Sequence, residues 1–163
     1  MSCYCGSSNA FSQCCQPFIL KKRSPETPEQ LMRSRYSAYA TNNPQYIFET
    51  YAQQKQQENT LDDIAQWAQE TQWLSLIIKD ASTVSIEQFN SEYLPTVNFI
   101  AYYNHDKQFY QMNECSRFIV EYGQWRYLDG DVTEHKVIQA PKRNDLCFCS
   151  SAKKFKKCCG KFS

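Results

Sequence analysis

Residues 60–81 read TLDDIAQWAQETQWLSLIIKDA and contain the change of pattern that decides the fold. Thr60 followed by Asp63 is a helix-start signal, and the apolar residues after Thr60 recur at helical spacing: Leu61, Ile64, Ala65 and Ala68. From Trp73 to Ala81 the chain is rich in aromatic and β-branched residues, which predicts a strand. The stretch therefore predicts helices before residue 72 and a sheet after it.

Two further helices are predicted on the N-terminal side of this stretch. Thr27-Pro28-Glu29-Gln30 has the form of a capping box with proline at the first helical position, and it predicts a helix that ends near Thr41. Asn43-Pro44 repeats the start signal and predicts a short helix through Tyr51. The residues from Gln53 to Gln57 are polar, and we expect them to form a solvated link.

On the C-terminal side the sequence predicts three more strands, Tyr93–Tyr103, Phe109–Tyr122 and Gln124–Asp129. Residues 104–107 and Gly123 supply hairpin turns between consecutive strands. Helices followed by an antiparallel meander give an α+β fold, in which one face of the sheet packs against the helices. A curved sheet wrapped around a helix would enclose a cone-shaped cavity.

Eight of the nine cysteines form two groups at opposite ends of the chain: Cys3, Cys5, Cys14 and Cys15, and Cys147, Cys149, Cys158 and Cys159. Each group has the form C-x-C-x8-C-C, and the second begins 144 residues after the first. Two further positions match at the same offset, Ser7 with Ser151 and Phe11 with Phe155. The two ends are therefore copies of one module.

The cysteine spacing favours a metal site at each end. A C-x-C turn aims two sulfurs at one point, and the C-C pair can complete a tetrahedron about a soft cation such as zinc, although thiolates also accept iron. Disulfides are the alternative, but adjacent cysteines bridge only through a strained ring, and a reducing compartment disfavours other bridges. Four-thiolate sites are usually structural, so we expect up to two ions per chain, each ordering an end too short to bury its own core.

Residues 143–160, RNDLCFCSSAKKFKKCCG, resemble the SEC-C motif, the zinc-binding tail of the bacterial translocase ATPase SecA. In that family the usual form is RNDPCPCGSGKKYKKC followed by Cys or His. Here Leu146 and Phe148 replace prolines, and Ser150 and Ala152 replace glycines. Glycine readily accepts the positive φ angles of a tight knuckle, so the two glycine replacements put the affinity of the C-terminal site in doubt.

With such a motif at each end, the chain resembles the bacterial YchJ family throughout its length. The resemblance rests also on Leu31–Tyr36, Ser116–Phe118 and Trp125–Gly130. It implies an NTF2-like middle domain, and it supplies no established reaction. We expect an N-terminal module at residues 1–24, an NTF2-like domain at 25–137, and a linker with the basic C-terminal module at 138–163.

The cavity of such a domain is where a small ligand or a reaction would be found. The residues expected near it are Arg33, Arg35, Tyr36, Trp73, Glu114, Arg117, Trp125 and Asp129, with Trp67 as a further wall. A carboxylate in an apolar pocket could serve as a base. The alternative, which we favour, is a buried network in which Glu114 or Asp129 pairs with Arg33 or Arg117 and holds the first helix to the sheet.

Composition excludes several classes of protein. The four glycines, Gly6, Gly123, Gly130 and Gly160, lie too far apart for a dinucleotide or P-loop fingerprint. Every apolar stretch is far shorter than the roughly 20 residues that span a bilayer, and the N-terminus does not read as a secretory signal. His105 is predicted in a turn and His135 in the stretch leaving the domain. We therefore expect a cytoplasmic protein, assign no catalytic residue and do not favour an enzyme.

The net charge of +1 conceals a polarised chain: residues 1–35 carry +3, residues 36–141 carry −8 and residues 142–163 carry +6. Lys153, Lys154, Lys156 and Lys157 surround Phe155 between the cysteine pairs. This cationic knob is either a solubilising surface or a site for an acidic protein or an RNA backbone. Resemblance to the translocase tail implies an acidic export chaperone or the ribosome as partner. The acidic middle of the chain disfavours wrapping by nucleic acid, so any RNA contact should be confined to the basic ends.

The sequence thus favours a non-catalytic cytoplasmic adaptor with two zinc modules. An enzyme or small-ligand-binding protein that uses the cavity is the second interpretation, and a metal or redox sensor is the third. Related cone folds often dimerise through their sheets, so a homodimer is compatible with each.

Overall fold

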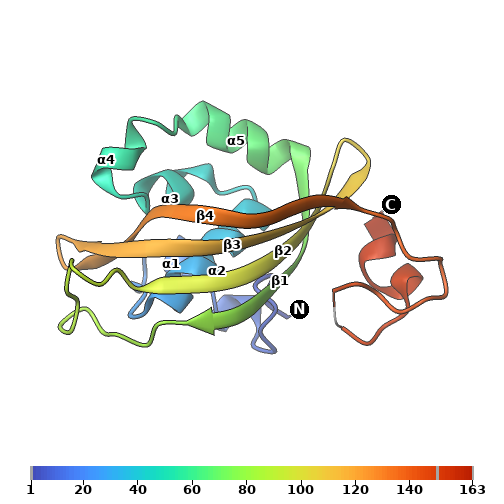
Figure 1. Cartoon of the computed structure of the whole chain (residues 1–163), viewed down its shortest axis with the longest axis horizontal. Coiled ribbons are helices and arrows are strands. Elements are labelled where there is room, and N and C mark those ends of the chain that lie inside the picture. Colours follow the sequence, from blue (N-terminus) through green and yellow to red (C-terminus); the bar gives the residue numbers. More distant parts are fainter. Residues whose placement is uncertain (1, 150, 163) are drawn as a thin grey trace.

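The computed structural model describes residues 2–149 and 151–162. In chain order its elements are η1 (Phe11–Gln13), α1 (Gln16–Ile19), α2 (Pro28–Ala40), α3 (Pro44–Glu49), α4 (Gln53–Gln56), α5 (Leu61–Glu70), β1 (Thr71–Ala81), β2 (Thr96–His105), β3 (Gln108–Glu121), β4 (Gln124–Ile138), η2 (Phe155–Lys157) and η3 (Cys159–Phe162), where η denotes a 3-10 helix. Among the described residues, five α-helices and the 3-10 helix η1 precede the sheet, so the order of helices before strands is the one that residues 60–81 predict (Figure 1).

Two of the three predicted helix-start signals form side-chain caps, whereas Asn43 precedes α3 without one. The Thr27 hydroxyl accepts a hydrogen bond from the Gln30 amide at 3.2 Å, and the Thr60 hydroxyl accepts one from the Asp63 amide at 3.1 Å. Helix α3 ends at Glu49 rather than at Tyr51 because the following backbone pairs with β4. The polar link from Gln53 to Gln57 contains the short helix α4.

The four strands form one antiparallel sheet in the order β1-β2-β3-β4. Two turns have both central residues in the left-handed region: Asp106 and Lys107, with φ of 49° and 62°, and Tyr122 and Gly123, with φ of 52° and 70°. This is the geometry of the two-residue turns that match strand twist. The predicted α+β meander is therefore confirmed.

Strand β4 continues nine residues beyond the predicted end at Asp129. The extension pairs with β3 as far as Ile138, which lies opposite Phe109. This pairing satisfies the backbone N–H and C=O groups of the extension. The apolar pattern of these residues is too weak to predict a strand. His135 consequently lies on the sheet, and its Nε2 atom is 2.6 Å from the Tyr103 hydroxyl. The prediction that His135 belongs to a stretch leaving the domain was wrong.

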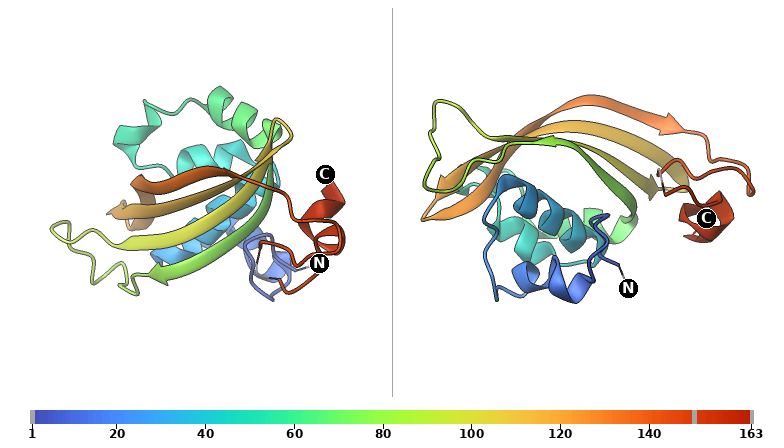
Figure 2. Two further views of the ribbon diagram at one scale, coloured as in Figure 1. Left: turned by 45° about the vertical axis from the view of Figure 1, so that its right-hand side comes forward. Right: turned by 90° about the horizontal axis from the view of Figure 1, so that it is seen from below.

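The helices cover one face of the sheet, which bends over them (Figure 2). The interior between these layers contains Leu31, Ile47, Val97, Phe118 and Trp125, each with 1% or less of its surface exposed. The last segment of the chain leaves the far end of β4 and folds beyond the helices, at the end of the sheet (Figures 1 and 2). The molecule is thus a helix-backed sheet with a cysteine module at each end of the chain.

Candidate metal centres

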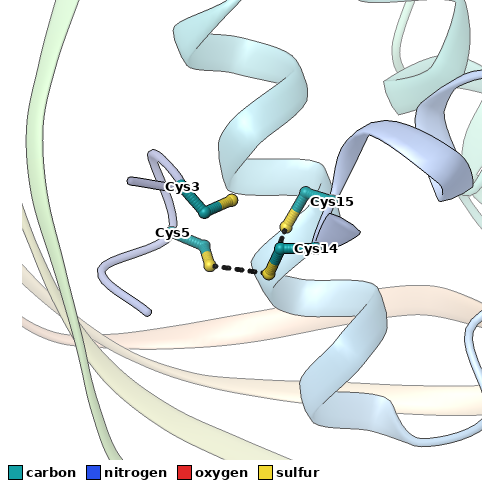
Figure 3. Close-up of side chains that lie close together, drawn as sticks. All are labelled: Cys3, Cys5, Cys14 and Cys15. Atoms are coloured by element: carbon teal, nitrogen blue, oxygen red, sulfur yellow. Dashed lines mark hydrogen bonds between the residues drawn. The ribbon is translucent and has the colours of Figure 1, made fainter. Parts of the chain in front are cut away.

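The four N-terminal cysteines converge from two short segments. Cys3 and Cys5 lie in the first loop, Cys14 follows η1, and Cys15 is the N-cap of α1 (Figure 3). The Cys5 and Cys14 sulfurs are 3.7 Å apart, those of Cys14 and Cys15 are 3.9 Å apart, and all four lie within 4.8 Å of one another. A tetrahedron of sulfurs about 2.3 Å from a zinc ion has edges of about 3.8 Å, so this arrangement has the size of a four-thiolate site.

Gly6 makes the N-terminal knuckle possible. It has a φ of +82°, and its amide donates to the Cys3 carbonyl at 3.3 Å. A Cβ atom at this position would lie 2.8 Å from the Leu76 carbonyl oxygen of β1. Glycine is therefore needed at residue 6 both for the left-handed turn and for the close approach of the module to the sheet.

The C-terminal cysteines repeat this geometry. The sulfurs of Cys147, Cys149, Cys158 and Cys159 also lie within 4.8 Å of one another, with Cys149 and Cys158 at 3.4 Å. The same backbone bond closes each loop, from the Cys3 amide to the Asn9 carbonyl and from the Cys147 amide to the Lys153 carbonyl, both at 2.8 Å. The eight cysteines thus come together in two tetrads, as the spacing predicts.

The matching serine and aromatic positions have matching roles. Ser7 Oγ lies 3.2 Å from Cys14 Sγ, and Ser151 Oγ lies 3.2 Å from Cys158 Sγ. Each serine is thus a hydrogen-bonding neighbour of the third sulfur, as in the outer shell of a metal site. Ring contacts repeat as well, between Tyr4 and Phe11 at 5.3 Å and between Phe148 and Phe155 at 5.9 Å.

The knuckles differ at one of the positions where the sequence departs from the SEC-C pattern. Ala152 has a φ of +56°, a conformation that is costly for any residue with a Cβ atom. Its N-terminal counterpart, Ser8, does not have a positive φ. The other departure, Ser150, lies outside the described residues. Ala152 therefore occupies a backbone conformation that the glycine of the SEC-C pattern would accept more readily.

The tetrads are electrostatically suited to a cation. A hydrogen bond from the Cys15 thiol lowers the pKa of Cys5 to about 4, and the same bond raises the pKa of Cys15. In the second module a hydrogen bond from Cys159 lowers the pKa of Cys149 to about 4 and raises that of Cys159. Each tetrad thus supports one thiolate with neighbouring thiols, and a bound cation would release the remaining protons. All nine cysteines are free thiols, so an all-sulfur set suited to a soft metal is present at each end.

The two modules differ in how they join the rest of the molecule. Cys3, Cys5 and Cys15 belong to the main hydrophobic core together with Leu31 and Phe118. Arg33 of α2 also donates to the Cys5 carbonyl at 2.8 Å. The C-terminal cysteines belong to a separate small cluster around Phe109, Phe148 and Phe155. The N-terminal module is therefore part of the main core, whereas the C-terminal module packs on the end of the sheet.

Four of the residues expected near a cavity line one of about 180 Å³: Arg35, Tyr36, Trp73 and Glu114. Trp67 is a further wall, as expected. Tyr51 and Tyr127 also line the cavity, and sequence reasoning missed both. Tyr127 could have been predicted, because side chains alternate along β4 and Tyr127 lies two residues after buried Trp125, on the same face.

The other candidates lie elsewhere. Arg33 pairs with Glu29 at 2.7 Å beside the N-terminal module, and the Trp125 indole donates to the Glu26 carbonyl at 3.1 Å. Arg117 and Asp129 pair at 2.6 Å. Arg117 lies on the opposite face of the sheet from Glu114 because side chains alternate along β3, and Asp129 lies beside it because a bulge in the β3–β4 pairing separates it from the face of Tyr127. The expected arginine and carboxylate pairing thus exists for Arg117 and Asp129, but this pair is half-buried and does not join the first helix to the sheet.

The lysines between the C-terminal cysteines form most of a basic surface. Lys153, Lys154 and Lys157 are exposed, and Lys156 is half-buried. None of the salt bridges among the described residues involves any of these four lysines. Phe155 is only 6% exposed and packs against Phe109 and Phe148. It therefore belongs to the interior of the module rather than to the surface on which sequence reasoning placed it.

Among the described residues, no helix combines the length and the apolar character that a bilayer span requires.

Comparison with known families finds a match for the middle domain and one for the C-terminal module. Residues 27–130 match the profile of the YchJ middle NTF2-like domain, and residues 143–161 match the SEC-C motif. A UPF0225 protein of Vibrio cholerae serotype O1 is 38% identical over 160 residues, covering 98% of this chain and 100% of that protein. A UPF0225 protein of Vibrio parahaemolyticus is 39% identical over 170 residues, covering 98% of each.

Two solved structures are similar as well. The solution structure of a SEC-C motif containing protein from Rhodopseudomonas palustris shares 31% identity, with a TM-score of 0.71 over 82% of this chain and 100% of that one. The crystal structure of a SEC-C motif containing protein from Psychrobacter arcticus shares 28% identity, with a TM-score of 0.65 over 100% of this chain and 97% of that one.

Proposed function

Because this chain belongs to the YchJ family, whose relatives also carry the name UPF0225, we propose that it is a non-catalytic cytoplasmic adaptor ordered by two zinc ions. Cys3, Cys5, Cys14 and Cys15 would hold one ion, and Cys147, Cys149, Cys158 and Cys159 the other. Zinc bound by four thiolates supplies a structural cross-link and no open position for a substrate. The observation that carries the proposal is the repeated tetrad, two sets of four sulfurs each within 4.8 Å.

The choice of zinc rests on the donor set and the shape of the sites. Four sulfurs arranged as a tetrahedron suit zinc, and the same set accepts iron. Free thiols throughout the chain are those of a reducing compartment, which supports a cytoplasmic location.

The partner of the adaptor would be an acidic protein surface that meets the basic C-terminal module. Residues 142–163 carry a charge of +6, and binding one zinc ion through four thiolates lowers that by about two. The remaining positive charge is concentrated on a small rigid surface around Lys153, Lys154 and Lys157. The middle of the chain carries −8 and would repel an extended nucleic-acid backbone that ran across it. A compact acidic protein, such as an export chaperone, could contact the basic module alone and is therefore favoured over extended RNA.

Charge reversal tests the adaptor function. The triple variant Lys153→Glu, Lys154→Glu and Lys157→Glu should lose recovery of acidic chaperones from a lysate of the native host. The matched control reverses three exposed lysines outside the module, Lys22, Lys79 and Lys107, with the same change in net charge. Equal recovery by both variants and the wild type removes the adaptor proposal. If the triple variant instead loses co-sedimentation with ribosomes while its recovery of chaperones is unchanged, the basic surface is assigned to the ribosome.

A further inference from the structure

The cavity of about 180 Å³ under the sheet contains polar groups that the metal modules do not use. Its walls are largely aromatic, and Trp73 is at their centre. The Trp73 ring contacts Tyr36 at 5.5 Å, Tyr39 at 5.2 Å and Trp67 at 6.4 Å between ring centres. Trp67 is 36% exposed, so this side of the cavity meets solvent at α5. A cavity of about 150 Å³ is known to accept benzene, so the space suits one ring with a small substituent.

One end of the cavity has a fixed positive charge. Arg35 is 3% exposed and donates through Nη1 to the Ile47 carbonyl and to Thr50 Oγ1, both at 2.7 Å. Its guanidinium carbon lies 4.3 Å from the ring centre of Tyr51 and 4.6 Å from that of Tyr127. Within the described part of the chain, no carboxylate lies within 4.0 Å of this guanidinium. The stacking holds the guanidinium rigidly without neutralising its charge.

The carboxylate of Glu114 is held equally firmly. Its Oε1 atom accepts hydrogen bonds from Ser116 Oγ at 2.8 Å and from Tyr127 Oη at 2.7 Å. Gly130 makes room for it, because a Cβ atom there would lie 2.6 Å from Glu114 Cδ. Among the described residues, nothing donates a hydrogen bond to Glu114 Oε2. Glu114 lines the cavity, so this second carboxylate oxygen is available to accept from a ligand donor.

A free donor complements this acceptor. The Trp73 indole nitrogen is buried, and no described residue accepts its hydrogen. An unsatisfied buried N–H is costly, so a ligand that accepts from it gains binding free energy beyond its apolar contacts. The Tyr36 hydroxyl is also buried without a described partner.

We propose that this cavity binds a neutral, planar, single-ring molecule that carries both a hydrogen-bond acceptor and a donor, as a cyclic amide does. The ring would pack among the aromatic walls, its carbonyl would accept from Trp73 Nε1, and its N–H would donate to Glu114 Oε2. A cation would share the small cavity with Arg35 and an anion with Glu114, so either loses by repulsion what it gains by attraction. A purely apolar ring would leave the Trp73 N–H unpaired. The site is separate from both cysteine tetrads, so its failure would leave the zinc proposal unchanged.

Indole N–H resonances of the full-length, metal-loaded protein test this assignment directly. The probes are 2-pyridone as the cyclic amide, benzoate as the anion, benzylamine as the cation and toluene as the apolar ring. We expect 2-pyridone to bind most tightly and to move the Trp73 indole signal. The Trp125 signal should stay in place, because that indole already donates to the Glu26 carbonyl. Tighter binding of any of the other three probes would overturn the class of ligand. An unmoved Trp73 signal with saturating 2-pyridone would overturn the site.

Glu114→Gln supplies a variant test. The glutamine can still accept from Ser116 and Tyr127 through its Oε1, but its other terminal atom becomes a donor, which faces the ligand N–H unfavourably. Affinity for 2-pyridone should fall by at least about 10-fold, the usual value of a hydrogen bond to a charged group. Asp129→Asn is the matched control on the opposite face of the sheet and should leave the affinity unchanged. Equal affinities for wild type and Glu114→Gln would remove Glu114 from the site.

Discussion

Residue 152 has a strained backbone in a module whose four cysteines are all in place. In each tetrad the four sulfurs lie within 4.8 Å of one another, yet the C-terminal loop passes through Ala152 with a φ of +56°. An L-residue in the left-handed region costs roughly 1–2 kcal/mol, and glycine avoids most of this. The sequence located the departure, but only the backbone angle shows that Ala152, rather than Leu146 or Phe148, has a positive φ among the described residues.

Ala152→Gly should therefore strengthen the C-terminal module by about 1 kcal/mol after the greater chain entropy of glycine is counted. The measurement is the rate at which a chelator removes metal from this module, which should fall about fivefold. Ser8→Gly is the matched control at the equivalent N-terminal position, where φ is not positive, and it should bring no gain. An equal change in the rate of metal loss for both substitutions would contradict a cost of strain at Ala152.

At the scale of elements, the two cysteine modules have different neighbours. The N-terminal module shares the main core with α2, and the Cys3 sulfur lies 3.7 Å from the Ser37 hydroxyl of that helix. The C-terminal module packs on Phe109, Leu74 and Ile138 at the end of the sheet. Sequence comparison shows two copies of one module but not this difference, because both copies contain the same ligands. The difference arises from what each module packs against.

Cys5→Ser should consequently destabilise the whole domain, whereas Cys149→Ser should disorder only the C-terminal module. Losing a structural ligand from the main core at a cost of about 4 kcal/mol would lower the Tm by on the order of 10 °C for a chain of this size. Calorimetry and the near-ultraviolet signal of the buried tryptophans would record it. A similar shift in Tm for both variants would contradict the separate packing of the two modules.

Helix α5 offers a second test at this scale. It begins at a Thr60 cap that accepts a hydrogen bond from the Asp63 amide, and it carries Trp67 at the open side of the cavity. Thr60→Ala should lower the free energy of unfolding by about 1 kcal/mol, as measured by urea denaturation. Thr83→Ala, in the exposed loop after β1, is the control and should have an effect close to zero. Equal losses would show that the cap does not stabilise α5.

At the scale of the whole molecule, both cysteine modules lie toward the same end of the fold, beside the start of β1 (Figure 2). Gly6 approaches the Leu76 carbonyl, and Leu74 packs in the C-terminal cluster. The middle of the chain has a net negative charge, and the two segments that contain the cysteine modules have a net positive charge. The two modules lie on one side of the molecule. The adaptor proposal therefore requires that an acidic partner approach from this side of the molecule.

Much of this arrangement follows from the sequence. The helix starts at Thr27 and Thr60, the meander and both tetrads are local patterns, and each is found as predicted. The end of β4 was missed because its last residues are held by pairing with β3 rather than by an apolar pattern of their own. Arg117 and Asp129 were placed near the cavity because the face of a strand residue depends on the register and on bulges, and the bulge between Tyr127 and Asp129 has no local sequence signal. The Tyr51 and Tyr127 sandwich around Arg35 depends on contacts between distant segments, which no local pattern contains.

The central claim is that a metal ion held by each tetrad orders that end of the chain. The most direct test is native mass spectrometry of protein purified without added metal, combined with hydrogen exchange of the same sample before and after chelation. We predict two zinc ions per chain, and loss of protection at the Cys3 and Cys147 amides once the ions are removed. Metal-free protein whose two amides remain as protected as before, or cysteines of a tetrad joined to one another as disulfides, would contradict the account.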